Sequence, residues 1–64
     1  MTRVGYMVVT EIHDAGSVER WFYGCWDDED RANEVALELG AHDGIYHIVI
    51  DASNAEAMGV QNIY

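Results

Sequence analysis

Two segments rich in β-branched and aromatic residues flank a short turn sequence, and this arrangement constrains the fold more than any other feature. Residues 3–13 read RVGYMVVTEIH and residues 18–26 read VERWFYGCW, a composition typical of β-strands. The sequence DAGS at 14–17 combines a glycine with short polar side chains that favour a turn. We therefore expect an antiparallel hairpin with a four-residue loop.

Counting outward from the expected loop gives the register of this hairpin. The count places a glutamate opposite an arginine and an aromatic side chain over a strand glycine. Both arrangements stabilise antiparallel pairs. The predicted pairs are His13 with Val18, Glu11 with Arg20, Val9 with Phe22, Val8 with Tyr23 and Gly5 with Trp26.

An acidic run after the second strand predicts the start of a helix. Asp27 or Asp28 is a good N-cap, and Glu29 and Asp30 fall in the first turn, where acids face the positive end of the helix dipole. Gly40 suits the position just after the last turn. Between these ends, one apolar stripe follows the helical spacing i, i+3, i+4, i+7. It consists of Ala32, Val35, Ala36 and Leu39.

Two further elements are expected after this helix. Residues 44–51, GIYHIVID, predict a third strand that is largely apolar on both faces. The sequence SNAE at 53–56 has the pattern of a capping box, so we expect a short helix at 54–58 that ends at Gly59. For residues 60–64 the sequence leaves three alternatives open, namely an edge strand, a docking arm or a loose tail.

The order of elements, β-β-α-β, predicts an α+β fold. The chain has no proline and no linker composition, so we treat residues 1–64 as one small domain. A right-handed crossover through the helix makes the second and third strands parallel. The simplest sheet then has strand order 2-1-3, with the first strand antiparallel to both neighbours. We expect a two-layer β-β-α-β sandwich with one main helix and a short C-terminal helix.

One helix covers only one face of a three-stranded sheet, yet both faces of this hairpin are apolar. We assign to the helix the face whose glycine permits a close approach. The opposite face carries Tyr, Trp and Thr side chains, which suit a half-buried surface. The face assigned to the helix holds Met7, Val9, Phe22, Gly24 and Trp26, and the opposite face holds Val4, Tyr6, Val8, Thr10, Ile12, Trp21, Tyr23 and Cys25.

The opposite face is a candidate interaction surface, because monomers rarely leave such an apolar patch uncovered. A chain of 64 residues also buries a limited core and commonly gains stability from a partner. The face could be covered by the C-terminal segment, by a second copy in a homodimer, or by a different protein. The segment would contribute Met58, Val60, Ile63 and Tyr64. The interaction face itself would consist of Tyr6, Val8, Thr10, Trp21 and Tyr23.

The charge of the chain limits its partners. Twelve acids stand against three arginines and no lysine, for a formal net charge of −9 at pH 7. This charge repels phosphate backbones and anionic lipids and attracts basic partners. We therefore expect no direct nucleic-acid binding and no membrane binding. The single cysteine and an N-terminus without a signal-peptide pattern lead us to expect a cytoplasmic protein.

No group of residues in the sequence predicts an active site or a metal centre. The three histidines lack the close spacing of structural zinc ligands. Asp27 and Asp28 follow Cys25 and disfavour a reactive thiolate, so we interpret this cysteine as a small buried apolar residue. Glu34 and Glu38 lie on one helix of a chain too small to enclose a substrate. We expect no enzymatic activity, no metal and no cofactor.

Two hypotheses about function follow, and both involve binding to a protein. The first is a small acidic interaction module without enzymatic activity, which forms a homodimer or acts on a host protein. Its size and acidity are similar to those of bacteriophage accessory proteins. The alternative is an inhibitor that mimics the charge of a nucleic-acid backbone and occupies the site of a DNA- or RNA-binding protein. The acidic helix of that alternative carries Asp27, Asp28, Asp30, Glu34 and Glu38.

Overall fold

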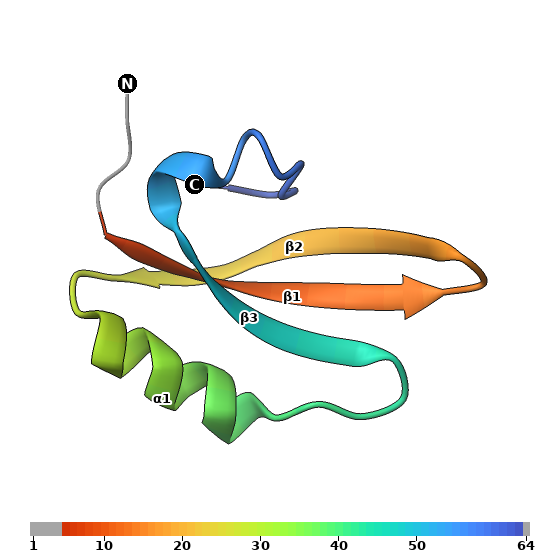
Figure 1. Cartoon of the computed structure of the whole chain (residues 1–64), viewed down its shortest axis with the longest axis horizontal. Coiled ribbons are helices and arrows are strands. Elements are labelled where there is room, and N and C mark those ends of the chain that lie inside the picture. Colours follow the sequence, from red (N-terminus) through yellow and green to blue (C-terminus); the bar gives the residue numbers. More distant parts are fainter. Residues whose placement is uncertain (1–4, 64) are drawn as a thin grey trace.

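The computed structural model describes residues 5–63 and contains one sheet and one α-helix (Figure 1). Strand β1 is central and runs antiparallel to both neighbours, so the strand order is β2-β1-β3. This confirms the predicted α+β architecture and the 2-1-3 order. Val4 and Tyr64, which were assigned above to the opposite face and to its cover, lie outside the described residues. The elements are β1 Tyr6–Asp14, β2 Ser17–Trp26, α1 Glu29–Leu39, β3 Ile45–Asp51 and the 3-10 helix η1 Ala52–Asn54.

The loop between β1 and β2 is shorter than predicted. Asp14 pairs with Ser17, so only Ala15 and Gly16 form the loop, and both have positive φ angles of 48° and 86°. Two-residue turns with this backbone match the twist of the strands that they join. The hydroxyl of Ser17 also donates to the Asp14 carbonyl at 2.9 Å. The outer residues of the predicted four-residue loop therefore close the hairpin instead of lengthening the loop.

The register of the hairpin changes at a β-bulge. The predicted pairs hold from the turn as far as Val9 with Phe22. Beyond that point Val8 faces Gly24, and Tyr23 is left as an additional residue in β2. Such an insertion reverses the side of the sheet to which the later residues of the strand point. Two predicted pairs are therefore wrong, namely Val8 with Tyr23 and Gly5 with Trp26, because Tyr6 is the residue that faces Trp26.

Helix α1 packs on the side of the sheet that carries Val8. Val8 and Ala32 are fully buried in this layer together with the nearly buried Val35, and Trp26 packs against them. The prediction that the helix covers Met7, Val9 and Phe22 is wrong, since these residues lie on the other side. Gly24 and Trp26 do lie on the helix side, because the bulge separates them from Phe22.

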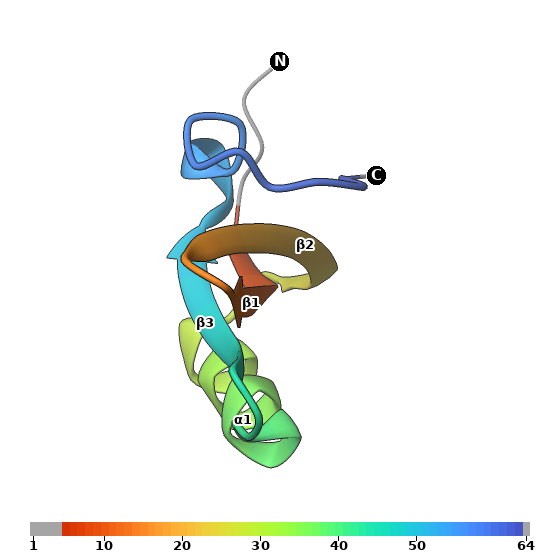
Figure 2. The ribbon, with the colours of Figure 1, turned by 90° about the vertical axis from the view of Figure 1, so that its right-hand side faces the viewer.

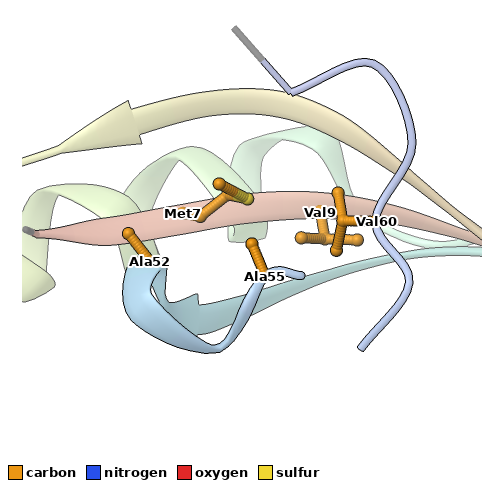
Figure 3. Packing of buried hydrophobic residues seen from close by; sticks show 5 residues of the cluster. All are labelled: Met7, Val9, Ala52, Ala55 and Val60. Atoms are coloured by element: carbon orange, nitrogen blue, oxygen red, sulfur yellow. The ribbon is translucent and has the colours of Figure 1, made fainter. Parts of the chain in front are cut away.

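The C-terminal segment covers the face opposite to the helix (Figure 2). Its Val60 is buried beside the β1 residues Met7 and Val9 (Figure 3). Gln61 also pairs with the outer edge of β2, where its carbonyl accepts from Phe22 N and its N–H donates to the Arg20 carbonyl, both at 2.8 Å. The tail is thus a docked arm. It covers one face, as one alternative proposed, but not the face that was expected to need a cover.

Capping side chains determine where the two helices begin. Asp28 is the N-cap of α1, and its side chain accepts from Asp30 N at 3.0 Å, which confirms the acidic run as a helix start. The short C-terminal helix begins earlier than predicted and is a 3-10 turn. Asp51 caps it by accepting from Ser53 N at 3.0 Å, so Ser53 is not the capping residue that the sequence pattern indicated.

Candidate functional site

The exposed aromatic residue Tyr23 is the centre of the candidate site. As the additional residue of the bulge it has no opposite residue on β1, and 49% of its surface remains exposed. Its ring stacks against Trp26 with centroids 6.4 Å apart and planes inclined by 16°. Offset stacking of this kind is a favoured arrangement of aromatic pairs.

Gly24 allows Trp26 to take this position. A Cβ atom on Gly24 would lie 2.8 Å from Cη2 of the Trp26 indole, which is closer than real Cβ contacts. The indole therefore lies against the glycine of its own strand. This is the aromatic cover of a strand glycine that the sequence predicted, but on Gly24 instead of Gly5.

His47 of β3 completes the aromatic group. Its ring meets that of Tyr23 edge to face, with centroids 6.2 Å apart and planes at 81°. Its Nδ1 donates to the carbonyl of Gly40 at 2.8 Å, so the ring is fixed to the end of α1. On the sheet, Thr10 of β1 pairs with both His47 and Trp21 and thus lies on the same side. We call this group the Tyr23 surface: Thr10, Trp21, Tyr23, Trp26 and His47.

The predicted interaction face is only partly available for contact. Val8 is 0% exposed beneath α1, and Tyr6 packs against the same helix layer. Thr10 and Trp21 are half-buried, and Tyr23 is exposed. Sequence reasoning missed Trp26, which it assigned to the core, and His47, which it did not assign to any surface. The glycine within β2 was the signal that could have located Trp26, because such a residue often marks a bulge or a close approach.

Trp21 carries an unusual polar group. Its indole Nε1 is buried without a hydrogen-bond partner, which is true of no other side-chain nitrogen or oxygen in residues 5–63. A buried donor without an acceptor costs about 1–3 kcal/mol. The ring itself is only half-buried. Trp21 therefore brings a buried, unsatisfied donor to the Tyr23 surface.

Exposed acidic residues follow the Tyr23 surface in the sequence. Asp27 and Asp28 follow Trp26 directly, and every acid of the chain except Glu11 is exposed. Both arginines in the described part of the chain are paired: Arg20 with Glu11 at 3.0 Å and Arg31 with Glu34 at 3.5 Å. The surface charge of residues 5–63 is therefore dominated by carboxylates.

The predicted acidic helix is exposed, but some of its acids have roles within the chain. Asp28 caps the helix and Glu34 pairs with Arg31. Asp27, Asp30 and Glu38 are exposed on the same helix or at its start. The run thus serves helix formation first and leaves a negative outer surface.

A second polar group lies on the opposite face and joins three parts of the chain. The Glu11 carboxylate accepts from His13 Nε2 at 2.7 Å and from Arg20 Nε at 3.0 Å. These hydrogen bonds from His13 and Arg20 hold the pKa of Glu11 below its usual value. Arg20 also donates to the Met58 carbonyl at 3.4 Å. This arrangement ties the hairpin to the C-terminal segment, which is a structural role.

The remaining candidate groups add no chemistry to the site. Cys25 is exposed, so its interpretation as a buried residue is wrong. It pairs with Met7 and lies on the side away from Tyr23. Within residues 5–63 no three His, Cys, Asp or Glu side chains are grouped so that they could hold a metal ion. No helix in the same range is long and apolar enough to cross a membrane.

Comparison of the chain with protein-family models, with curated protein sequences and with solved structures finds no match.

Proposed function

We propose that this chain is a protein–protein interaction module without enzymatic activity, and that it binds its partner through the Tyr23 surface. The observation that carries the proposal is the exposure of Tyr23 within an ordered aromatic group. Tyr and Trp are enriched among the residues that dominate binding energy, because they bury a large area at little cost in conformational entropy. A rigid aromatic group on a strand also needs little reordering on binding.

Other exposed apolar residues support this choice by contrast. Leu37 is 80% exposed on the outer side of α1, among acidic neighbours. Tyr46 is 44% exposed on the face opposite to Tyr23, and its ring contacts only His13 among the ring pairs described, at a centroid distance of 4.9 Å. Tyr23 is the exposed residue that is joined by two further rings on its own side of the sheet.

The partner that we propose is a different protein. Two copies of this chain would bring formal charges of −9 together, and like charges oppose association at low salt. A homodimer through the predicted face would also use Val8, which is buried beneath α1. For these reasons we place the second copy among the outcomes that the experiment must exclude.

The nucleic-acid mimic is the weaker of the two hypotheses. Asp28 and Glu34 of its proposed helix are already engaged within the chain. A mimic also requires carboxylates spaced like phosphates, and the sequence supplies only their number. We therefore argue the aromatic surface alone.

The test compares two tyrosines of similar exposure on opposite faces. The immobilised chain is exposed to an extract of the cells in which it occurs, and bound proteins are compared between wild type, Tyr23→Ala and Tyr46→Ala. We expect specific partners to be lost with Tyr23→Ala and kept with Tyr46→Ala. Far-ultraviolet circular dichroism of each variant checks that the fold is intact.

The mass in solution is measured by light scattering at low and high salt alongside this comparison. We expect a monomer under both conditions. A dimer that dissociates with Tyr23→Ala would assign the surface to self-association and overturn the proposed binding of a different protein. Equal recovery of partners by both tyrosine variants would remove the Tyr23 surface as the binding site.

A further inference from the structure

We infer that the partner segment that docks on the Tyr23 surface is basic and places an arginine side chain against the aromatic rings. This inference rests on the proposed function and adds the chemistry of the partner. It combines two independent features of the surface: the arrangement of its rings and the sign of the charge around them.

The rings provide a platform for a planar cation. Tyr23 and Trp26 are nearly parallel, and Tyr23 keeps half of its surface exposed. A guanidinium group stacks on such aromatic faces and is less strongly hydrated than an ammonium group. Because Gly24 and the His47 ring fix the two aromatics in place, the platform is formed before binding.

The charges around the platform select the same type of ligand. Asp27 and Asp28 begin directly after Trp26, and Glu19 lies on β2 two residues before Trp21. All three are exposed. Carboxylates at these positions accept hydrogen bonds from a guanidinium or attract further basic residues of the same segment. A basic segment thus meets opposite charge beside the rings.

The chain itself does not supply this cation from its described residues. Arg20 is bound to Glu11 on the opposite face, and Arg31 is bound to Glu34 on the helix. The sequence contains no lysine. The net charge of −9 also disfavours a nucleic acid, an anionic membrane and a second copy as occupants. A basic peptide segment is the occupant that both features favour.

The experiment uses three synthetic peptides of equal length on a Gly/Ser background, carrying arginines, lysines or glutamates at the same positions. Each is titrated into the isotopically labelled full chain, and binding is followed by nuclear magnetic resonance. We expect the arginine peptide to shift the signals of Tyr23, the Trp26 indole and His47. We expect it to bind more tightly than the lysine peptide, by up to about five-fold, which is the full value of an exposed cation–π contact. The glutamate peptide should not bind.

Three variants test which residues produce the affinity for basic peptides and the preference for arginine. Tyr23→Leu keeps an apolar side chain without the ring and should abolish the preference for arginine over lysine. Tyr46→Ala should leave both affinities unchanged. Asp27→Asn should weaken both basic peptides, and added salt should do the same because the attraction is screened. Signal dispersion in each spectrum reports whether the variant is folded.

The outcomes separate this inference from the proposed function. Equal binding of the arginine and lysine peptides, or shifts centred on the outer side of α1, would overturn the inference. If in that case Tyr23→Ala still loses partners from the cell extract, the proposed function stands with a partner of different chemistry. If Tyr23→Leu leaves the peptide titration unchanged and Tyr23→Ala leaves the recovery of partners unchanged, both proposals fail.

Discussion

Replacing Val60 by alanine measures how firmly the C-terminal segment is held on the sheet. Val60 is 8% exposed and packs in one cluster with Met7, Val9, Ala52 and Ala55 (Figure 3). The change removes two buried methyl groups, at about 0.8 kcal/mol for each carbon. A partly collapsed cavity adds to this transfer cost. We expect the free energy of unfolding to fall by about 2 kcal/mol in total.

That loss is a large fraction of the free energy of unfolding expected for a chain of this size. Domains have roughly 0.05–0.15 kcal/mol of stability per residue, which gives about 3–10 kcal/mol for 64 residues. Urea unfolding followed by tryptophan fluorescence is a suitable assay. With a urea dependence of about 1 kcal/mol/M for a small domain, the midpoint should fall by about 2 M.

Leu37→Ala is the matched control for this prediction. It removes more carbon than the change at Val60, but Leu37 is 80% exposed. Its effect should stay within about 0.5 kcal/mol, as for other surface substitutions. A loss below about 0.5 kcal/mol for Val60→Ala would refute the packing of the segment on the sheet. A large loss for Leu37→Ala, with a midpoint that depends on protein concentration, would show instead that the helix surface is buried in an assembly.

Three further predictions concern the turn, the cap and the acid response. Because the pKa of Glu11 is lowered from 4.5 by hydrogen bonds from His13 and Arg20, its contribution to stability is complete above about pH 4.5 and is lost as the pH falls through the lowered pKa. Urea midpoints measured from about pH 6 down to about pH 3 should therefore decline less in Glu11→Gln than in wild type. Asp28→Ala removes the N-cap of α1 and should lower stability by about 1 kcal/mol in urea unfolding, and an unchanged midpoint would contradict the capping role. Ala15→Asn places a residue that tolerates positive φ in the two-residue turn and should raise the thermal midpoint by several degrees, whereas a lower midpoint would argue against this turn geometry.

The order of elements was predictable because separate local signals agreed. The turn sequence separated the first two strands. The acidic run, the apolar stripe and Gly40 then indicated the start, the buried face and the end of one and the same helix. Asp28 and Gly40 occupy the expected capping positions. The 2-1-3 order then followed from the handedness of the crossover and the short hairpin connection.

The side of the sheet on which the helix lies was not predictable from the same pattern. Residues 6–9 of β1 are apolar on both faces, so this part of the strand does not specify which face packs against the helix. The sequence therefore contained little information on which face of the sheet the helix covers. Gly24 was the one local indication of an irregular strand, and its consequence depended on where the additional residue was placed.

The candidate site could be predicted only in part, because its residues depend on the same assignment of sheet faces. Trp21 and Tyr23 were selected because they are aromatic and lie on a strand, and the exposure of Tyr23 agrees with that selection. The place of Val8 under the helix does not agree, because it depends on the assignment of faces. His47 joins the group only through the pairing of β1 with β3, which connects residues far apart in the sequence.

The single additional residue in β2 also brings two rings of the most aromatic stretch of the chain to the same side of the sheet, directly before the acidic start of α1 in the sequence. By reversing the side of the strand, the bulge turns Trp26 towards the helix layer and leaves Tyr23 exposed on the same side of the sheet. The helix begins almost at once, and the acids at its start follow Trp26 directly in the sequence. Residues at the start of the helix thereby add exposed negative charge directly after Trp26. A strand without the bulge would place Trp26 on the face now covered by the C-terminal segment and would separate the two rings. The stacking of Tyr23 on Trp26 is thus a consequence of one local irregularity, and the acidic start of the helix follows the two rings in the sequence.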